Sequence, residues 1–335
     1  MSDNLLEVRN LKTFFNTEDG VLKAVNDVSF KVKKGETVCI VGESGCGKSM
    51  TAMSIMGLVP KDNGFYDGGE ILFEGKDILN SSEDNLRKIR GKDIAMIFQE
   101  PMSSLNPTFT VGFQIMEPLI LHEKLSKKEA KNKAIELLKE VGIPRSDKIV
   151  DSYPHELSGG MRQRVMIAMA LACNPKVLIA DEPTTALDVT IQAQILDLMR
   201  NIKNEFNTSI LLITHDLGVV AEMAEYVVVM YAGKVVEEGP VNQIFKSPSH
   251  PYTIGLLKSK PVISKRQEEL YSIPGQVPNL VNMKDLCYFS DRCDKCMNKC
   301  RENMPQLKII EEGHKVACWL FEEIPSEEEL KWKVK

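Results

Sequence analysis

The segment at residues 42–49, with the sequence GESGCGKS, limits more than any other stretch how this chain can fold. It follows an apolar run at residues 37–41, which predicts a buried strand, and precedes residues 50–58, a stretch without proline that favours a helix. The spacing G-x-x-x-x-G-K-S between a strand and a helix is that of a P-loop. The sequence therefore predicts a phosphate-binding turn in an α/β domain.

Each part of this motif has its own task. Gly42, Gly45 and Gly47 allow a close backbone approach, so that successive amide N–H groups can point at one phosphate chain. The following helix adds the positive end of its dipole. Lys48 supplies a positive charge for the β and γ phosphates, and Ser49 a hydroxyl for Mg²⁺.

Length and charge narrow the class of protein. At 335 residues the chain is long enough for one large domain and a smaller one. Its net charge of −5 argues against nucleic acid as the main partner, because a basic face would then be expected. We expect no secretory signal, and no run reaches the roughly 18 apolar residues of a membrane-spanning helix. The expectation is a cytoplasmic protein that acts at a membrane only through a partner.

Polar side chains follow three later apolar strands directly. Four apolar residues run into Asp181 and Glu182, a Walker B pattern in which Asp181 can hold Mg²⁺. The other two strands lead into Gln99 and His215.

A second anion site is predicted where the sequence LSGGMRQR begins a helix. Ser158 is a plausible N-cap, and Gly159 and Gly160 leave backbone N–H groups uncovered. No helix breaker occurs before residues 174–175, where the sequence is Asn-Pro.

The remaining parts are organised around this core. Residues 5–35 predict short strands, and one of Phe14 and Phe15 could stack on an adenine ring. We favour Phe15; a core aromatic at a strand end is the alternative. From residue 111 to about residue 141 apolar residues recur at helical spacing, which predicts a helical insertion.

Eight cysteines are placed unevenly, and five of them fall within residues 287–318. In a reducing cytosol such a cluster is more often a metal site than a disulfide framework.

The order of P-loop, strand-end glutamine, LSGG, Walker B and strand-end histidine resembles the nucleotide-binding domain of ABC transporters. Residues 99–107, 250–253 and 273–275, with the C-terminal cysteines, resemble the ATPase subunits of dipeptide, oligopeptide and nickel importers. The resemblance implies an α/β P-loop ABC ATPase with an N-terminal antiparallel β lobe, a helical insertion and a small Cys-rich C-terminal extension. The nucleotide-binding domain would span residues 1–250, with the insertion at about 100–165, and the extension residues 251–335.

The resemblance also assigns roles. Glu182 would be the general base, His215 would contact the γ-phosphate, and Gln99 would sense it. Mg²⁺ would be held by Ser49, Gln99 and Asp181. One subunit would contact ATP through Phe15, Gly42, Ser44, Gly45, Cys46, Gly47, Lys48, Ser49 and Thr51, and the other through Ser158, Gly159 and Gly160, with Asp188 bridging the dimer. Cys46 is expected to be a small residue that fits the loop, with a redox switch as the alternative.

Four of the clustered cysteines match a ligand set that resembles that of a [4Fe–4S] cluster: Cys287, Cys293, Cys300 and Cys318. Zinc suits four thiolates equally well, and the absence of a metal is a third alternative. Cys296 departs from the family's pattern and could replace one ligand or stay free.

The predicted function is ATP hydrolysis that powers import of dipeptides and oligopeptides. The partners implied are a second ABC ATPase, in a hetero- or homodimer, two membrane permease subunits and an extracytoplasmic solute-binding protein. The chain would sit peripherally at the cytoplasmic face of the membrane and use ATP and Mg²⁺. Two alternatives remain: an importer of nickel or another small solute, and a soluble ABC ATPase, against which the acidic charge counts. The C-terminal cysteines could also sense redox state.

Overall fold

A computed structural model of the chain describes residues 3–100, 104–185, 188–259 and 271–322. Residues 101–103 of the motif at 99–107, residues 186–187 before Asp188, and parts of the extension predicted for 251–335 lie outside these ranges.

The chain divides into two compact units. The first comprises Met1–Leu6, Val32–Thr37 and Asp77–Ile213, and the second comprises Glu7–Lys31, Val38–Lys76 and Thr214–Lys335. The C-terminal extension and the P-loop belong to the same unit, so the proposed boundary at residue 250 lies within the second unit.

Three parallel strands form the centre of the first unit, in the order β8-β7-β6. They are β6 (Ile94–Ile97), β7 (Val177–Asp181) and β8 (Ser209–Ile213). Every residue in them is buried, which explains their continuous apolar runs. Because the strands are parallel, the residues that follow them meet at one edge of the sheet.

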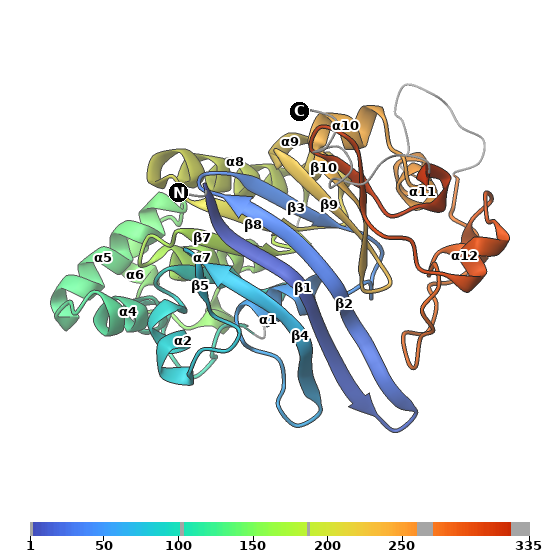
Figure 1. Cartoon of the computed structure of the whole chain (residues 1–335). Coiled ribbons are helices and arrows are strands. Elements are labelled where there is room, and N and C mark those ends of the chain that lie inside the picture. The colour runs from blue at the N-terminus through green and yellow to red at the C-terminus, as the bar shows by residue number, and fades with distance from the viewer. Residues whose placement is uncertain (1–2, 101–103, 186–187, 260–270, 323–335) are drawn as a thin grey trace. The chain divides into compact units, whose positions relative to one another are not determined.

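Helices and one 3-10 turn complete this unit. They are α2 (Glu83–Ile89), α4 (Val111–His122), α5 (Lys127–Glu140), α6 (Ser146–Ile149), η1 (Pro154–Glu156), α7 (Gly159–Leu171) and α8 (Val189–Phe206). The predicted helical segment at residues 111–141 is two helices, α4 and α5, which pack against each other (Figure 1). The second helix begins at a capping box, in which Ser126 and Glu129 each accept the other's backbone N–H.

The second unit carries most of a four-stranded sheet and five strands of another. The first sheet has the order β2-β1-β4-β5, with β1 (Asn4–Thr17), β2 (Gly20–Lys33), β4 (Gly64–Phe73) and β5 (Lys76–Asp77). In the other, β3 (Thr37–Val41) pairs in parallel with β9 (Tyr226–Tyr231), and β10 (Lys234–Pro240), β12 (His314–Val316) and β11 (Lys308–Glu311) follow in antiparallel order. The strands of the C-terminal extension thus continue the sheet that carries the P-loop.

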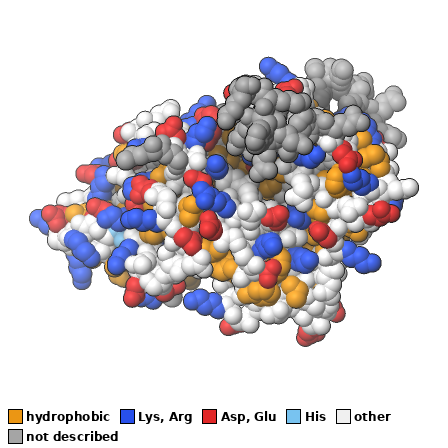
Figure 2. Space-filling view, in the orientation of Figure 1, with side chains coloured by type: hydrophobic (Ala, Val, Ile, Leu, Met, Phe, Trp, Pro, Cys, Tyr) orange, Lys and Arg blue, Asp and Glu red, His pale blue; other side chains and the backbone are white. Residues whose placement is uncertain are grey.

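Short helices complete this unit. They are α1 (Lys48–Ile55), α9 (Leu217–Met223), α10 (Val241–Lys246), α11 (Pro251–Lys258), η2 (Ser290–Arg292), α12 (Asn298–Glu302) and η3 (Trp319–Phe321). Among the described residues, no helix combines the length and the apolar character needed to cross a membrane. On the face shown in Figure 2, Lys and Arg side chains are interspersed with Asp and Glu.

Candidate functional site

The P-loop joins β3 to α1 in the second unit, and its shape requires glycine. Gly42 and Gly47 have φ angles of 153° and 97°. A Cβ on Gly47 would lie 2.3 Å from the carbonyl oxygen of Ala24, and a Cβ on Gly42 would lie 2.1 Å from that of Met230. Both positions therefore exclude any side chain, because the neighbouring backbone leaves no space.

The ammonium group of Lys48 lies inside this loop. Its Nζ donates hydrogen bonds to the carbonyl oxygens of Gly42, at 2.9 Å, and Glu43, at 3.0 Å. Thr51 is buried in the first turns of α1, where its Oγ1 donates to the carbonyl oxygen of Gly47 at 2.9 Å. A positive charge held at a helix N-terminus suits the binding of a phosphate chain.

The other predicted residues of the loop differ in exposure. Ser44 and Gly45 are exposed and Ser49 is half-buried, whereas Cys46 is buried. Burial raises the pKa of the Cys46 thiol, and the nearby Lys48 ammonium opposes this only in part. A neutral, buried thiol is a poor nucleophile, which favours the interpretation of Cys46 as a small residue that fits the loop.

Phe15 lies on β1 and is 8% exposed, and its neighbour Phe14 is also buried. The ring of Phe15 packs close to Gly64, where an added Cβ would come within 2.9 Å of it. A ring enclosed in this way has little surface for an adenine base, so the structure favours the alternative of a core aromatic.

In the first unit, Gln99 and Glu182 meet at the edge where the parallel strands end. Gln99 Nε2 donates to Glu182 Oε2 at 3.2 Å, and the hydroxyl of Thr185 donates to the same oxygen at 2.8 Å. Glu182 has a φ of 46°, a conformation that costs free energy in a residue with a side chain. The carboxylate is therefore held by two donors on a turn that places it beyond the strand.

Asp181 is the last residue of β7 and is only 4% exposed. It provides a buried carboxylate at the strand end, a hard oxygen ligand of the kind that Mg²⁺ prefers. Two residues later, the carbonyl oxygen of Pro183 accepts a hydrogen bond of 2.6 Å from Nε2 of the buried Gln163. Sequence reasoning missed Gln163 and Thr185; the only signal was their position within the two motifs.

The sequence LSGG lies at the start of α7. Ser158 caps this helix by accepting a hydrogen bond from the backbone N–H of Met161, as predicted from its type and position. Ser158 and Gly159 are exposed, and a Cβ on Gly159 would meet no other atom within 4 Å. Nothing in the described part of this chain therefore requires glycine at that position.

Asp188 and His215 are both exposed. Asp188 caps α8 by accepting a hydrogen bond of 2.9 Å from the backbone N–H of Ile191, and the adjacent Val189 is 83% exposed. An apolar side chain so exposed beside a predicted dimer contact was not singled out from the sequence. His215 follows β8 and belongs to the second unit.

The C-terminal cysteines affect one another's pKa electrostatically. Burial, with a further contribution from Cys300, Cys318 and Cys293, raises the pKa of Cys287 to about 12. Burial likewise raises the pKa of Cys318 to about 11. No group of three or more His, Cys, Asp or Glu side chains among the residues the structure describes has an arrangement that could hold a metal ion.

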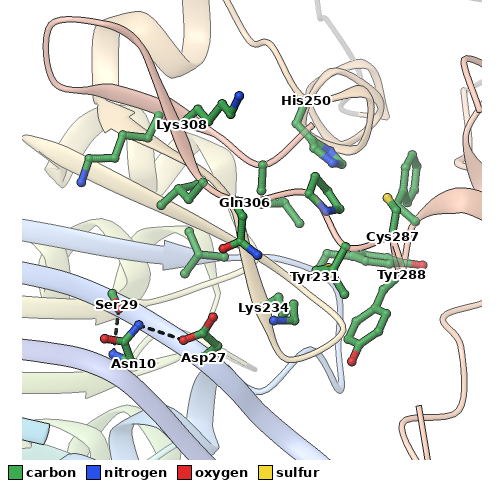
Figure 3. A pocket seen from close by; sticks show the side chains of 18 of the residues that line it. Asn10, Asp27, Ser29, Tyr231, Lys234, His250, Cys287, Tyr288, Gln306 and Lys308 are labelled. Atoms are coloured by element: carbon green, nitrogen blue, oxygen red, sulfur yellow. Dashed lines mark hydrogen bonds between the residues drawn. The ribbon is translucent and has the colours of Figure 1, made fainter. Parts of the chain in front are cut away.

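Two concave features are lined by none of the predicted nucleotide residues. A cavity of about 330 Å³ opens in the second unit between the N-terminal strands and the extension; Figure 3 shows Asn10, Asp27, Lys234, Cys287 and Gln306 around it. In the first unit, a groove of about 370 Å³ runs along α4, and its lining is mainly apolar. It is lined by Phe113, Met116, Glu117, Ile120, Leu121 and Lys127.

Comparison with known proteins shows which family models and relatives this chain is similar to. The family model described as "ABC transporter" matches residues 25–185, and that of the "Oligopeptide/dipeptide transporter, C-terminal region" matches residues 236–300. The oligopeptide transport ATP-binding protein AppD of Bacillus subtilis is 55% identical over 324 residues, covering 97% of this chain and 99% of that protein. The dipeptide transport ATP-binding protein DppD of Bacillus subtilis is 51% identical, with 95% of each chain covered.

Solved structures are also similar to this chain. The dimeric ATP-binding cassette MJ0796, in a post-hydrolysis state bound to ADP and Pi, superposes with a TM-score of 0.64 at 30% identity. The match covers 70% of this chain and 98% of that one.

Proposed function

The chain belongs to the ABC transporter family, among the ATP-binding subunits of oligopeptide and dipeptide importers, and from that premise we propose how its residues hold and hydrolyse ATP. It is the ATP-binding component of such an import system and couples ATP hydrolysis to peptide transport. A soluble ABC ATPase without a transport role is set aside, because relatives of nearly the same length carry transport in their names.

In the proposed site the P-loop binds the phosphate chain. Lys48 neutralises charge on the β and γ phosphates. The backbone N–H groups at the start of α1 donate hydrogen bonds to the phosphate oxygens. Gln99, Asp181 and Ser49 offer the oxygen atoms that Mg²⁺ prefers, and a bound Mg²⁺ would neutralise charge on the phosphates. His215 contacts the γ-phosphate.

Glu182 acts as the general base. A water aligned with the γ-phosphorus gives its proton to the carboxylate as its oxygen attacks, and ADP leaves with the electron pair of the broken P–O bond. The observation that carries this assignment is the pair of hydrogen bonds from Gln99 and Thr185, which fix the carboxylate beside the buried Asp181. We expect the Glu182→Gln variant to bind ATP with unchanged affinity and to lose hydrolysis by at least about a hundredfold.

Two measurements test this assignment: equilibrium binding of ATP and release of phosphate. Both use the purified chain, with its partner ATPase added where activity requires it. Asp197→Asn, an exposed carboxylate on α8, serves as the matched control. Glu182→Gln turning over ATP at the rate of the control would overturn the role of Glu182.

A second ATPase subunit completes each site. Ser158, Gly159, Asp188 and Val189 are exposed, and the open space around Gly159 supports closure of another chain over this surface. MJ0796 was solved as a dimer bound to ADP and Pi, which supports the same arrangement.

The chain works with two membrane permease subunits and an extracytoplasmic solute-binding protein, at the cytoplasmic face of the membrane. The apolar groove on α4 supports this, because Phe113 and Leu121 are 51% and 57% exposed beside it. The cargo is dipeptides or oligopeptides. Uptake of labelled peptides by cells carrying Glu182→Gln tests this, with nickel uptake as the control: peptide uptake should be lost and nickel uptake should not change.

The cysteine set Cys287, Cys293, Cys300 and Cys318 would hold a [4Fe–4S] cluster or zinc only after its side chains rearranged, because the described residues show no group arranged to hold a metal ion. The support for this proposal is chemical, since four thiolates suit either group. Anaerobic analysis of iron, sulfide and zinc in the purified chain tests this, and the absence of all three would overturn it.

A further inference from the structure

The C-terminal extension contacts the P-loop through Glu43, the residue after the first glycine. The guanidinium of Arg292 binds its carboxylate with both nitrogens: Nη1 lies 2.6 Å from Oε2, and Nη2 lies 3.0 Å from Oε1. The Arg292 side chain is only 6% exposed. A two-point contact of this kind is stronger than a single hydrogen bond and restricts the carboxylate to one orientation.

Arg292 is itself held in place. Its Nε donates to the carbonyl oxygen of Pro274 at 2.9 Å, and Nη1 also lies 3.3 Å from the hydroxyl of Tyr231. Pro274 belongs to the sequence Ile-Pro-Gly at residues 273–275, which was singled out in the sequence but which the proposed catalytic site does not use. The guanidinium therefore joins this segment to the P-loop.

A second anchor holds the backbone of the same residue. The N–H of Glu43 donates to the hydroxyl of Tyr252 at 2.8 Å, while its carbonyl oxygen accepts from Lys48. Tyr252 is fully buried at the start of α11, where its own N–H donates to Nδ1 of His250. Side chain, N–H and carbonyl oxygen of Glu43 are thus each bound, two of them by residues from beyond residue 250.

We propose that Arg292 is a positioning residue for ATP: through Glu43 it holds the P-loop in the shape that binds phosphate. The proposal rests on the proposed ATP site at residues 42–49. A loop ordered before binding loses less conformational entropy when the ligand arrives, so the fixed loop binds more tightly. The extension, which lies outside the residues predicted to touch nucleotide, thereby contributes to nucleotide affinity.

The test measures equilibrium binding of ATP to the purified full-length chain by calorimetry. Arg292→Met should weaken binding about tenfold, and Arg292→Lys less, because it keeps the charge but not the two-point contact. Adding Glu43→Gln to Arg292→Met should weaken binding no further, since one interaction has already been removed. In steady-state hydrolysis the KM for ATP should rise while kcat at saturation is retained.

Arg301→Met is the matched control. Arg301 forms an exposed ion pair of 3.1 Å with Asp291 in the same extension and should leave ATP binding unchanged. If Arg292→Met does not fold, Glu43→Gln alone supplies the measurement, because Glu43 is partly exposed. Affinity within about twofold of wild type for the folded variant would overturn the proposal, as would equal losses in Arg292→Met and Arg301→Met. Lys48→Ala distinguishes failure of the Arg292 proposal from failure of the proposed ATP site. Wild-type ATP affinity in the Lys48→Ala variant would refute the ATP site itself.

Discussion

His250 is a titratable group that the fold keeps uncharged. Burial lowers its pKa to about 4, although the Glu237 carboxylate opposes the shift. In the unfolded chain its pKa is near 6.5, so between about pH 6.5 and pH 4 the unfolded state binds the proton and the folded state does not. Stability from this residue is complete above pH 6.5 and decreases as the pH falls toward 4.

We therefore expect the chain to lose about 2 kcal/mol of stability through His250 between pH 7 and pH 5. His250→Asn keeps an acceptor for the N–H of Tyr252 but cannot be protonated, so this variant should lose less stability over the same range. Urea unfolding at the two pH values measures the difference. If the unfolding free energy fell by the same amount in wild type and in His250→Asn, His250 would not be the group responsible.

At the scale of elements, a buried hydrogen bond joins α7 to the turn that follows β7. Gln163, within the first turns of α7, donates to the carbonyl oxygen of Pro183 just beyond Glu182. This contact links the helix that begins with LSGG to the turn that carries the proposed base. We expect a displacement of one element to be transmitted to the other.

The Gln163→Met variant keeps the volume of the side chain but leaves the carbonyl oxygen without its donor. We expect a loss of about 1–3 kcal/mol in unfolding free energy and a lower kcat, with ATP affinity unchanged. Gln194→Met, an exposed partner of Arg164, is the control. Thermal unfolding and steady-state ATPase assays measure both effects; an unchanged kcat would mean that the hydrogen bond is structural only.

At the scale of the whole molecule, substitution of Gly159 should affect transport without lowering the folding stability of this chain. An added Cβ meets no atom of the described chain within 4 Å, and alanine is the better helix former by up to about 1 kcal/mol. We expect Gly159→Ala to be as stable as wild type or slightly more so, and yet to lose transport, because in the proposed dimer the partner subunit would close over this surface.

Thermal unfolding of the purified variant and peptide uptake in cells measure the two effects separately. Ala substitution at Gly75, an exposed glycine with equally open surroundings but a positive φ, should show the reverse: lower stability with uptake retained. Normal uptake by the Gly159→Ala variant would argue against close contact at LSGG.

Much of this protein follows from sequence alone. The P-loop, the LSGG helix start and the Walker B carboxylates were predicted from residue type and local spacing, because these motifs depend on short-range backbone geometry and on strands that read as continuous apolar runs. The comparisons confirmed the family, the ABC ATPase fold and the peptide import system.

Only the tertiary structure decided which distant residues meet. Glu182 touches Gln99 across 83 positions, and Arg292 touches Glu43 across 249 positions. The burial of Phe15, which favours the core alternative, also emerged only from packing. The physical reason is common to these cases. A periodic pattern predicts the secondary structure of the segment in which it occurs. A contact between distant segments depends instead on how whole elements pack, and local spacing does not encode that packing.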